Sequence, residues 1–455
     1  MRRLNINAAR KYIFKFRVLF PVIGILILYF VYKSEIKSTT IPYSGQLPTQ
    51  KHVITEYNRY MTTFQTNHAN NSVPKERGDL QQNGDRKETG NQDIREVKLV
   101  ANDERIAMPE DNVEDERYPG TFSPSEYPSA VNLTGILNQY DMKGYSDEQP
   151  VNDIHYRYFV NPRHICNVSS DIKVLFIVKS SPWHTSARQT IRETWANTKR
   201  FPSIRIIFSF GTPKQSKRLE ALLEESSTHK DILIVKNYID NYYNLTLKTV
   251  SGLKWAVTHC ARASYVVSVD DDIYVAPDLL LRFLHRPQIR KIHKFFSGHL
   301  LIGTKPIRNP KDKWAISLSE YPFQNYPNYI FGGFVIMSMS TVKSFTIAAQ
   351  YTKLFKFEDV YLGILAAKLG IEATNNGYVN SRKTFTVSES FRTIIASHFY
   401  SDPKELQRAW DCHLSILDKS DEKSIFCDYI GKRLKKLKSE IDSIVSWMEN
   451  VKFNS

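Results

Sequence analysis

The sequence predicts an α/β fold with a mainly parallel central sheet in the second half of a 455-residue chain. Two observations support this fold class. From Asp171 onward, short apolar runs alternate with longer segments whose apolar residues recur at three- and four-residue spacing. Strands that alternate with helices favour parallel pairing through right-handed crossovers. In addition, the apolar run 265–269 ends in three aspartates, and ligands of open α/β sheets bind at the carboxyl ends of strands.

Each element of this fold follows from a local pattern. Uninterrupted apolar runs predict buried strands at 172–178, 204–210, 232–235 and 265–269. Helical spacing predicts helices at 185–198, 214–226 and 245–261. In the last of these helices the apolar stripe consists of Val250, Leu253, Val257 and Cys260.

The aspartates Asp270, Asp271 and Asp272 require something that neutralises their charge. Adjacent carboxylates repel one another, and their placement near a core is costly unless they are paired or bind a metal. Clustered carboxylate oxygens suit hard cations such as Mg²⁺ or Mn²⁺. The triplet therefore predicts a divalent-metal site in a ligand crevice. The alternative is a solvated acidic turn, because Asp is common in turns.

The formal net charge of +15 is compatible with nucleic acid or an anionic membrane as a partner. No zinc-finger, helix-turn-helix or RNA-binding signature accompanies that charge, so we expect no nucleic-acid partner. Part of the excess lies in residues 1–17, which contain six Lys or Arg residues and no acid.

An uncharged stretch of fifteen residues, 18–32, follows this basic start. A helix of that length covers ~22 Å, against a hydrocarbon core of ~30 Å. A start at Tyr12 gives 21 residues, provided that Lys15 and Arg17 reach the interface. The stretch ends in bulky residues without a small-x-small site, which favours a signal-anchor at 12–32 over a cleaved signal peptide. Residues 1–17 would then be a cytosolic tail, and the remaining chain lumenal.

Residues 33–165 are predicted to form a lumenal, largely disordered stem. The segment 74–118 is polar and has too few aromatic and branched residues to build a core, and order is expected to begin near 154–159. Four N-x-S/T sequons agree with a lumenal body, although any one could arise by chance: Asn70, Asn132, Asn167 and Asn244. In the last sequon, Thr246 could instead cap the following helix.

Cys412 and Cys427 are close in sequence and are the candidate disulfide pair for an oxidising lumen. Cys260 lies on an apolar helix stripe and is predicted to be a buried thiol. Residues 428–455 have the pattern of an amphipathic helix with a basic opposite face. Such a helix could pair two subunits into a homodimer or pack against the domain, and packing is favoured.

Four motifs resemble, in order, those of the β1,3-galactosyltransferase and β1,3-N-acetylglucosaminyltransferase family. They are R-x-x-x-R-x-T-W at 188–195, N-L-T-x-K-T at 244–249, the aspartate triplet with Ile-Tyr at 270–274, and E-D-V-Y-x-G at 358–363. The resemblance spans about residues 170–427. It implies a single-pass type II Golgi membrane enzyme with a GT-A type fold, a catalytic domain at 166–427, a UDP-sugar donor, and Mn²⁺ or, alternatively, Mg²⁺.

The resemblance also implies roles for the metal-site residues. Asp272 would bind the metal, Asp270 would bind it and lie near the donor ribose, and Asp271 would support them. A cation that bridges both phosphates would stabilise the charge on the departing diphosphate. His398 lies in a segment similar to the family's V-H-x-x-(S/D)-P-E-E-M and is implied as a further ligand, although a lone histidine is usually structural.

Asp359 is implied as the base that deprotonates the acceptor hydroxyl, with Glu358 at the donor site beside it. Both acids would also suit a helix amino terminus. Arg188 and Arg192 could pair with donor phosphates or serve as scaffold charges, and nucleotide contact is favoured for Arg188.

The segment 326–334 resembles the family's Y-P-P-Y-C-S-G-G-G. Gly332 and Gly333 would let the backbone approach the donor sugar, or would form a tight turn into the following strand. Asn328, Ile330 and a bulky Phe331 depart from this pattern, which leaves the sugar specificity open.

Together these features predict an inverting, metal-dependent β1,3-hexosyltransferase. It would move galactose or an N-acetylhexosamine from a UDP-sugar onto a glycan of a glycoprotein or glycolipid. Direct displacement with inversion needs one base and no covalent intermediate, which agrees with the single candidate Asp359. The alternative is a membrane-anchored glycan-binding or scaffold protein without catalysis, and the presence of both acidic motifs argues against it.

Overall fold

A computed structural model describes residues 127–167, 171–384 and 391–417, together with Ile54, Met61 and Ser123. These residues all belong to one compact unit, Val53–Ser455. The predictions for residues 1–32 and 428–455, for Asn70 and for Cys427 lie outside the described residues. Within the described ranges, no helix has the length and apolar character needed to cross a membrane.

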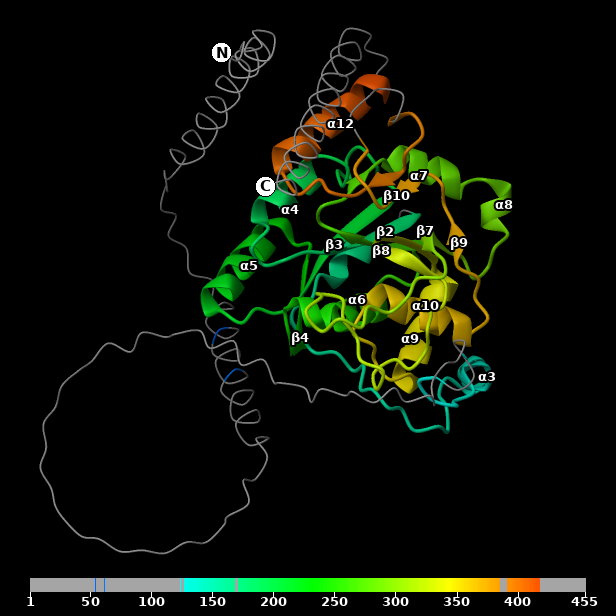
Figure 1. Ribbon diagram of the computed structural model, residues 1–455. Helices are drawn as coiled ribbons and strands as arrows, with labels where there is room; N and C mark the ends of the chain where they lie inside the picture. The colour runs from blue at the N-terminus through cyan, green and yellow to red at the C-terminus, as the bar shows by residue number, and fades with distance from the viewer. Residues whose placement is uncertain are drawn as a thin grey trace, which may run out of the picture. The chain divides into compact units, whose positions relative to one another are not determined.

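An eight-stranded sheet forms the centre of the fold (Figure 1). Its strands are β1 (Tyr158–Val160), β2 (Val174–Lys179), β3 (Ile204–Thr212), β4 (Ile232–Ile239), β5 (Tyr265–Asp270), β7 (Phe296–Leu301), β8 (Tyr329–Ser338) and β9 (Thr374–Asn375). They lie in the order β1-β4-β3-β2-β5-β8-β7-β9. All four strands predicted from the sequence are present.

The sheet is mixed rather than mainly parallel. The block β4-β3-β2-β5 is parallel, as predicted, and so is the β7–β9 pair. However, β1 runs antiparallel to β4, and β8 runs antiparallel to both β5 and β7. These antiparallel pairs involve β1 and β8, which are not among the four strands predicted from the sequence. An apolar run also has the same pattern in either direction, so the sequence does not indicate a strand's direction.

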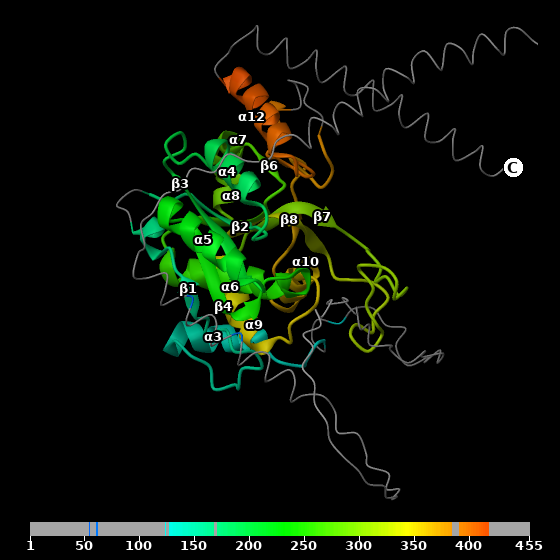
Figure 2. The same cartoon turned by 90° about the vertical axis from the view of Figure 1, so that its left-hand side faces the viewer.

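Helices pack on both faces of the sheet (Figures 1 and 2). They are α3 (Leu133–Lys143), α4 (Thr185–Glu193), α5 (Ser216–His229), α6 (Leu245–His259), α7 (Pro277–Leu284), α8 (Pro287–Arg290), α9 (Met339–Tyr351), α10 (Glu358–Lys368) and α12 (Pro403–Leu417). The predicted helices correspond to α4, α5 and α6.

Strand β2 is buried on both faces of the sheet, and this explains its continuously apolar sequence. Leu175 and Ile177 enter the core that contains residues of α6, α9 and α10. The alternate residues Val174, Phe176 and Val178 enter the second core, with residues of α4, α5, α7 and α12. A strand buried on both faces needs apolar side chains at every position, unlike a strand with one solvated face.

A small second sheet carries the segment around His398 toward the central sheet. It consists of β10 (Val379–Asn380), β11 (Ala396–Ser397) and β6 (Tyr274–Val275), in that order. Antiparallel pairing sets Ser397 opposite Tyr274, and the backbone N–H of Tyr400 donates to the carbonyl of Asp272. This pairing brings residues more than a hundred positions apart to the same edge of the fold.

The ordered domain begins earlier than predicted. Leu133 and Ile136 of α3 are buried in a core that also contains residues of α9, and the side chain of Asn152 donates to the carbonyls of Ala349 and Thr352. Strand β1 extends the sheet beside β4. The stem prediction for 33–165 is therefore wrong from residue 127 onward, because a short helix of mixed polarity gives little local signal.

A disulfide joins Cys166 to Cys260, whose Cα atoms lie 5.2 Å apart. The prediction that Cys260 is a thiol is therefore wrong. Cys166 ends the 3₁₀ helix Arg163–Cys166, and Cys260 follows the last residue of α6. Cys412 is also disulfide-bonded. Its predicted partner, Cys427, lies outside the described residues.

Candidate active site

A cavity of about 610 Å³ lies at the carboxyl ends of β2 and β5. Its wall includes Lys179, the aspartates 270–272, Lys248 of α6, Tyr242 and His398. The aspartate triplet therefore borders a cavity of a size suited to a small ligand.

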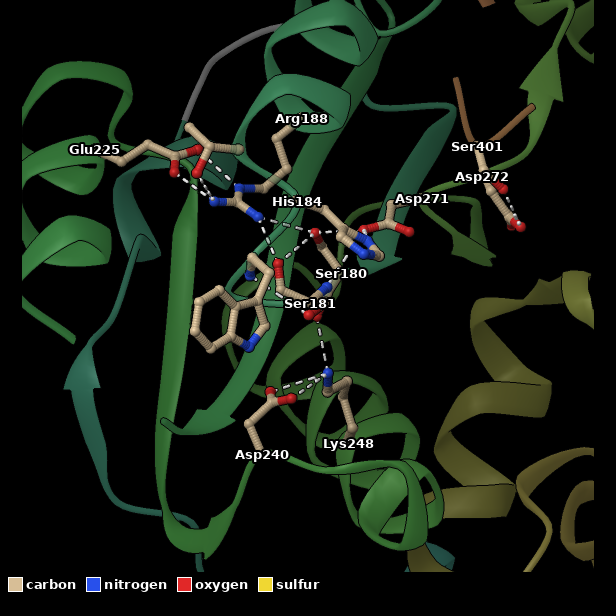
Figure 3. Close-up of polar contacts among 12 residues, drawn as sticks. Ser180, Ser181, His184, Arg188, Glu225, Asp240, Lys248, Asp271, Asp272 and Ser401 are labelled. Carbon is tan, nitrogen blue, oxygen red and sulfur yellow. Dashed lines mark hydrogen bonds and ion pairs between the residues drawn. The ribbon is translucent and has the colours of Figure 1, made fainter. Parts of the chain in front are cut away.

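The Asp271 carboxylate is bound by three protein groups. Its carboxylate accepts hydrogen bonds from the Ser180 hydroxyl at 2.7 Å and the Ser181 backbone N–H at 3.3 Å, and contacts Nδ1 of His184 at 2.8 Å (Figure 3). Burial disfavours its charge, but the bonds from His184 and Ser180 outweigh burial and lower the pKa of Asp271. This carboxylate fixes the segment after β2. Its predicted roles in supporting the motif and binding the donor stay predictions.

Asp270 is paired with a buried lysine that the sequence analysis missed. The Nζ atom of Lys179 lies 3.0 Å from Asp270 Oδ1 and 3.0 Å from Glu358 Oε1, and donates to the Gly332 carbonyl at 3.0 Å. Burial raises the pKa of Asp270 to about 6, although Lys179 opposes that rise. Lys179 is the last residue of β2, and a lysine at the end of an apolar run was the only signal available.

Asp272 and His398 face each other at the rim of the cavity. His398 Nε2 lies 3.3 Å from Asp272 Oδ2, and Nδ1 lies 3.2 Å from the Ser381 carbonyl. A carbonyl and a carboxylate both only accept, so both ring nitrogens are placed to donate. Burial opposes the charge, but the contact with Asp272 outweighs it and raises the pKa of His398. An imidazole fixed through its other nitrogen is typical of metal ligands.

These two side chains fit part of a divalent-metal site. Across the described ranges, no three His, Cys, Asp or Glu side chains converge as a complete metal cage. Asp270, predicted as a ligand, is engaged by Lys179 instead. An incomplete protein set suits Mg²⁺-type binding, in which one or two carboxylates act with substrate phosphates. The residues present therefore fit a cation that is held jointly with a diphosphate.

Asp359 lies in the first turn of α10, directly after Glu358. Burial and the neighbouring charge of Glu358 raise its pKa to about 7, while the backbone N–H of Val360 and Lys179 oppose the rise. A carboxylate with a pKa near neutrality is matched to proton acceptance at physiological pH. Glu358, by contrast, is engaged by Lys179.

Gly332 and Gly333 lie inside β8 and form no turn. A Cβ at Gly332 would stand 2.9 Å from Glu358 Oε1, and one at Gly333 would stand 2.4 Å from the ring of Phe331. Both glycines thus make room for protein atoms. Gly332 in particular allows β8 to approach the acidic start of α10 closely.

Comparison with known proteins agrees with this geometry. Residues 186–377 match the model of the galactosyltransferase family. The chain is 35% identical to beta-1,3-galactosyltransferase brn of Drosophila melanogaster over 248 residues, which covers 54% of this chain and 75% of the relative. It is 32% identical to beta-1,3-galactosyltransferase 1 of Homo sapiens over 280 residues, covering 61% and 83%.

This chain belongs to the β1,3-galactosyltransferase family. It is therefore a glycosyltransferase, as the motifs predicted. Among solved structures, it is similar to the galactosyltransferase LgtC in complex with donor and acceptor sugar analogues, with a TM-score of 0.30 and 12% identity, covering 53% of this chain and 95% of that one. At that score the likeness carries no structural argument.

In this glycosyltransferase the R-x-x-x-R motif is structural. Arg188 is fully buried and its guanidinium donates to Glu225 at 2.9 and 2.6 Å, to the Ser180 hydroxyl and to the Ser181 carbonyl (Figure 3). Arg192 pairs with Glu225 and Asp231. Neither arginine lines the cavity, so the expected contact with donor phosphates does not fit this structure.

The cations that do face the cavity come from other elements. Lys248 of the N-L-T-x-K-T motif donates to the Ser180 carbonyl at 2.9 Å and pairs with Asp240 at 2.9 Å (Figure 3). Lys179, Arg218 and Lys313 also line the cavity. A wall that combines these cations with carboxylates suits a ligand that carries both phosphate and hydroxyl groups.

The sequons of this glycosyltransferase differ in their surroundings. Asn132 and Asn167 are exposed, although Asn132 also accepts from the Gly135 N–H and caps α3. Asn244 donates to the Ile239 carbonyl at 2.8 Å, and the buried Thr246 hydroxyl donates to the Phe355 carbonyl. Asn244 is therefore a poor fit for a glycan, and Thr246 bonds across the fold and does not cap α6.

Proposed function

We propose that this glycosyltransferase moves galactose from UDP-galactose to a glycan hydroxyl, forming a β1,3 linkage with inversion at the sugar carbon. The names of its relatives support the sugar and the linkage. The observation that carries the mechanism is Asp359: a carboxylate with a pKa near 7 that directly follows Glu358, the ion-pair partner of Lys179 in the cavity wall.

Asp359 accepts the proton of the acceptor hydroxyl while that oxygen attacks the first carbon of the sugar and the UDP oxygen leaves. One displacement inverts the configuration and needs no nucleophile from the protein. Glu358 is held by Lys179, so Asp359 is the carboxylate of the pair that remains to accept a proton. Lys179 also holds Asp270, which we assign to the donor ribose.

Asp272 and His398 would hold Mn²⁺ or Mg²⁺ together with the diphosphate. When bound, the cation supplies positive charge where the leaving diphosphate gains negative charge. The protein contributes an imidazole oriented by the Ser381 carbonyl and a carboxylate positioned by the pairing of β11 with β6. Lys248, held in place by Asp240, adds a cation at the cavity wall.

The compartment belongs to the same proposal. We place the catalytic domain in the Golgi lumen, anchored through residues 12–32, with glycoprotein or glycolipid glycans as acceptors. The Cys166–Cys260 disulfide supports this placement, since disulfides persist in oxidising compartments. In microsomes the domain should resist protease until detergent is added. Digestion without detergent would contradict the placement.

A donor screen tests the activity. The purified chain is incubated with Mn²⁺, a panel of sugar acceptors, and either UDP-galactose, UDP-N-acetylglucosamine or UDP-N-acetylgalactosamine. We expect acceptor-dependent UDP release with UDP-galactose and a β1,3-linked product by NMR. Use of a different donor would overturn the sugar assignment, whereas an α-linked product would overturn inversion.

A further inference from the structure

Residues 302–328 connect β7 to β8 (Figure 2). Lys313 of this connection lines the cavity. The Arg308 guanidinium donates to four carbonyls in this connection, those of Ile316, Ser317, Tyr321 and Phe323, at 2.8 to 3.0 Å. Such a network holds the loop in one shape. Side chains on the loop are therefore presented in a defined position before any substrate arrives.

The loop presents Lys313 and Trp314 to Tyr242 at the cavity wall. Trp314 Nε1 donates to the Tyr242 hydroxyl at 3.0 Å, and Lys313 Nζ lies 4.2 Å from the centre of the Tyr242 ring. Tyr242 and Lys313 both line the cavity. Trp314 nevertheless remains 53% exposed. The indole Nε1–H of Trp314 thus has a hydrogen-bond acceptor, while much of the ring surface faces solvent.

A hydrogen bond ties the loop that carries Trp314 to the segment that precedes Asp359. The Lys356 ammonium, three residues before Asp359, donates to the carbonyl of Ala315 at 2.9 Å, and Ala315 directly follows Trp314. Burial raises the pKa of Tyr242, the bond from Trp314 opposes the rise, and the charges of Glu358, Asp359 and Asp270 add to it. The diphosphate side is marked instead by Asp272 and His398.

A pyranose ring has one face of C–H bonds, and those weakly positive hydrogens favour the electron-rich face of an aromatic ring. Ligand pockets are lined largely by apolar and aromatic side chains, with a few polar groups that fix the orientation of the ligand. We propose that Trp314, braced by Tyr242 and Lys313, is the acceptor subsite, and that it stacks on the hexopyranose ring whose hydroxyl is directed at Asp359. This inference rests on the proposed function and names the residues that select its acceptor.

Kinetics of Trp314→Ala and Trp314→Phe test the subsite. The Ala variant should raise the acceptor KM at least about tenfold, while the donor KM stays within about twofold. The Phe variant keeps a ring face and should stay within about threefold of the parent. Leu318→Ala, on the same loop and 48% exposed, is the matched control and should change neither KM. A rise in the donor KM would assign Trp314 to the nucleotide and overturn the proposal.

Binding without turnover separates this inference from the proposed function. Saturation-transfer NMR is recorded with methyl β-glycosides of galactose, glucose and N-acetylglucosamine, with and without UDP and Mn²⁺. We expect a signal from at least one glycoside that is lost in Trp314→Ala and retained in Leu318→Ala. No signal, or a signal that persists in Trp314→Ala, overturns the subsite even if UDP binds. Failure of UDP to bind overturns the proposed function, while a Trp314-dependent glycoside signal would still uphold the subsite.

Discussion

Asp271 and Asp272 are neighbours in one motif but stand in opposite environments. Asp271 has three protein partners and is nearly buried, within a network that continues through Ser180 to Arg188 (Figure 3). Asp272 is more exposed, and its carboxylate meets the His398 imidazole and the Ser401 hydroxyl, each at 3.3 Å. In the turn that follows β5, one aspartate is thus bound to the scaffold, while the other faces the cavity beside His398. Substitutions should separate the two roles.

The largest effect is expected at Asp272. Asp272→Ala should lower metal-dependent transfer by about a thousandfold or more, because it removes a ligand that would stabilise charge on the leaving diphosphate. Its melting temperature should remain close to the parent value, since the substitution also relieves repulsion among adjacent carboxylates. Turnover assays with and without EDTA, alongside a melting curve, check both points. Parent-level transfer in EDTA would remove the metal from the mechanism.

Asp359→Asn should come next, with transfer reduced by at least about a hundredfold. The amide keeps the size of the side chain but cannot accept the acceptor proton at neutral pH. Titration of UDP with Mn²⁺ by calorimetry should give parent-like affinity. Near-parent transfer would exclude Asp359 as the base and make Glu358 the next candidate. Loss of UDP binding together with transfer would mean that the residue holds the site together.

The pH profile gives a smaller, graded effect. The base must be deprotonated, and burial raises the pKa of Asp359 to about 7. The value of kcat/KM should therefore rise with pH up to about 7 and fall about tenfold for each unit below it. A profile that stays flat between pH 5 and 8 would be inconsistent with this assignment.

The smallest effect on transfer is expected at the scaffold aspartate. Asp271→Asn weakens the bonds with Ser180 and His184, so it should cost about 1–3 kcal/mol of stability. Transfer at a temperature where the variant is folded should fall less than about tenfold. Denaturant unfolding measures the first quantity, and a turnover assay at saturating donor measures the second. A thousandfold loss of transfer, as expected for Asp272→Ala, would show that Asp271 and Asp272 do not have separate roles.

Much of the fold and several site positions followed from the sequence because they depend on local properties. The periodicity in 172–269 predicted the parallel strands and their helices, and burial of both faces explains why those strands are continuously apolar. The aspartates at the end of β5 marked the edge of the sheet at which the cavity lies, since the end of a strand is visible in the chain itself. The motif at 358–363 likewise placed Asp359 at a helix start.

Only the tertiary structure decided which groups meet. The direction of β8, the Cys166–Cys260 bond and the burial of Arg188 all depend on packing between distant segments. Lys179 shows the reason most clearly: it joins β5, β8 and α10 through three contacts, yet in the sequence it is one lysine after an apolar run. The residue types at a strand end can be read from the local sequence. The partner of a buried charge, by contrast, depends on which elements the fold places beside it.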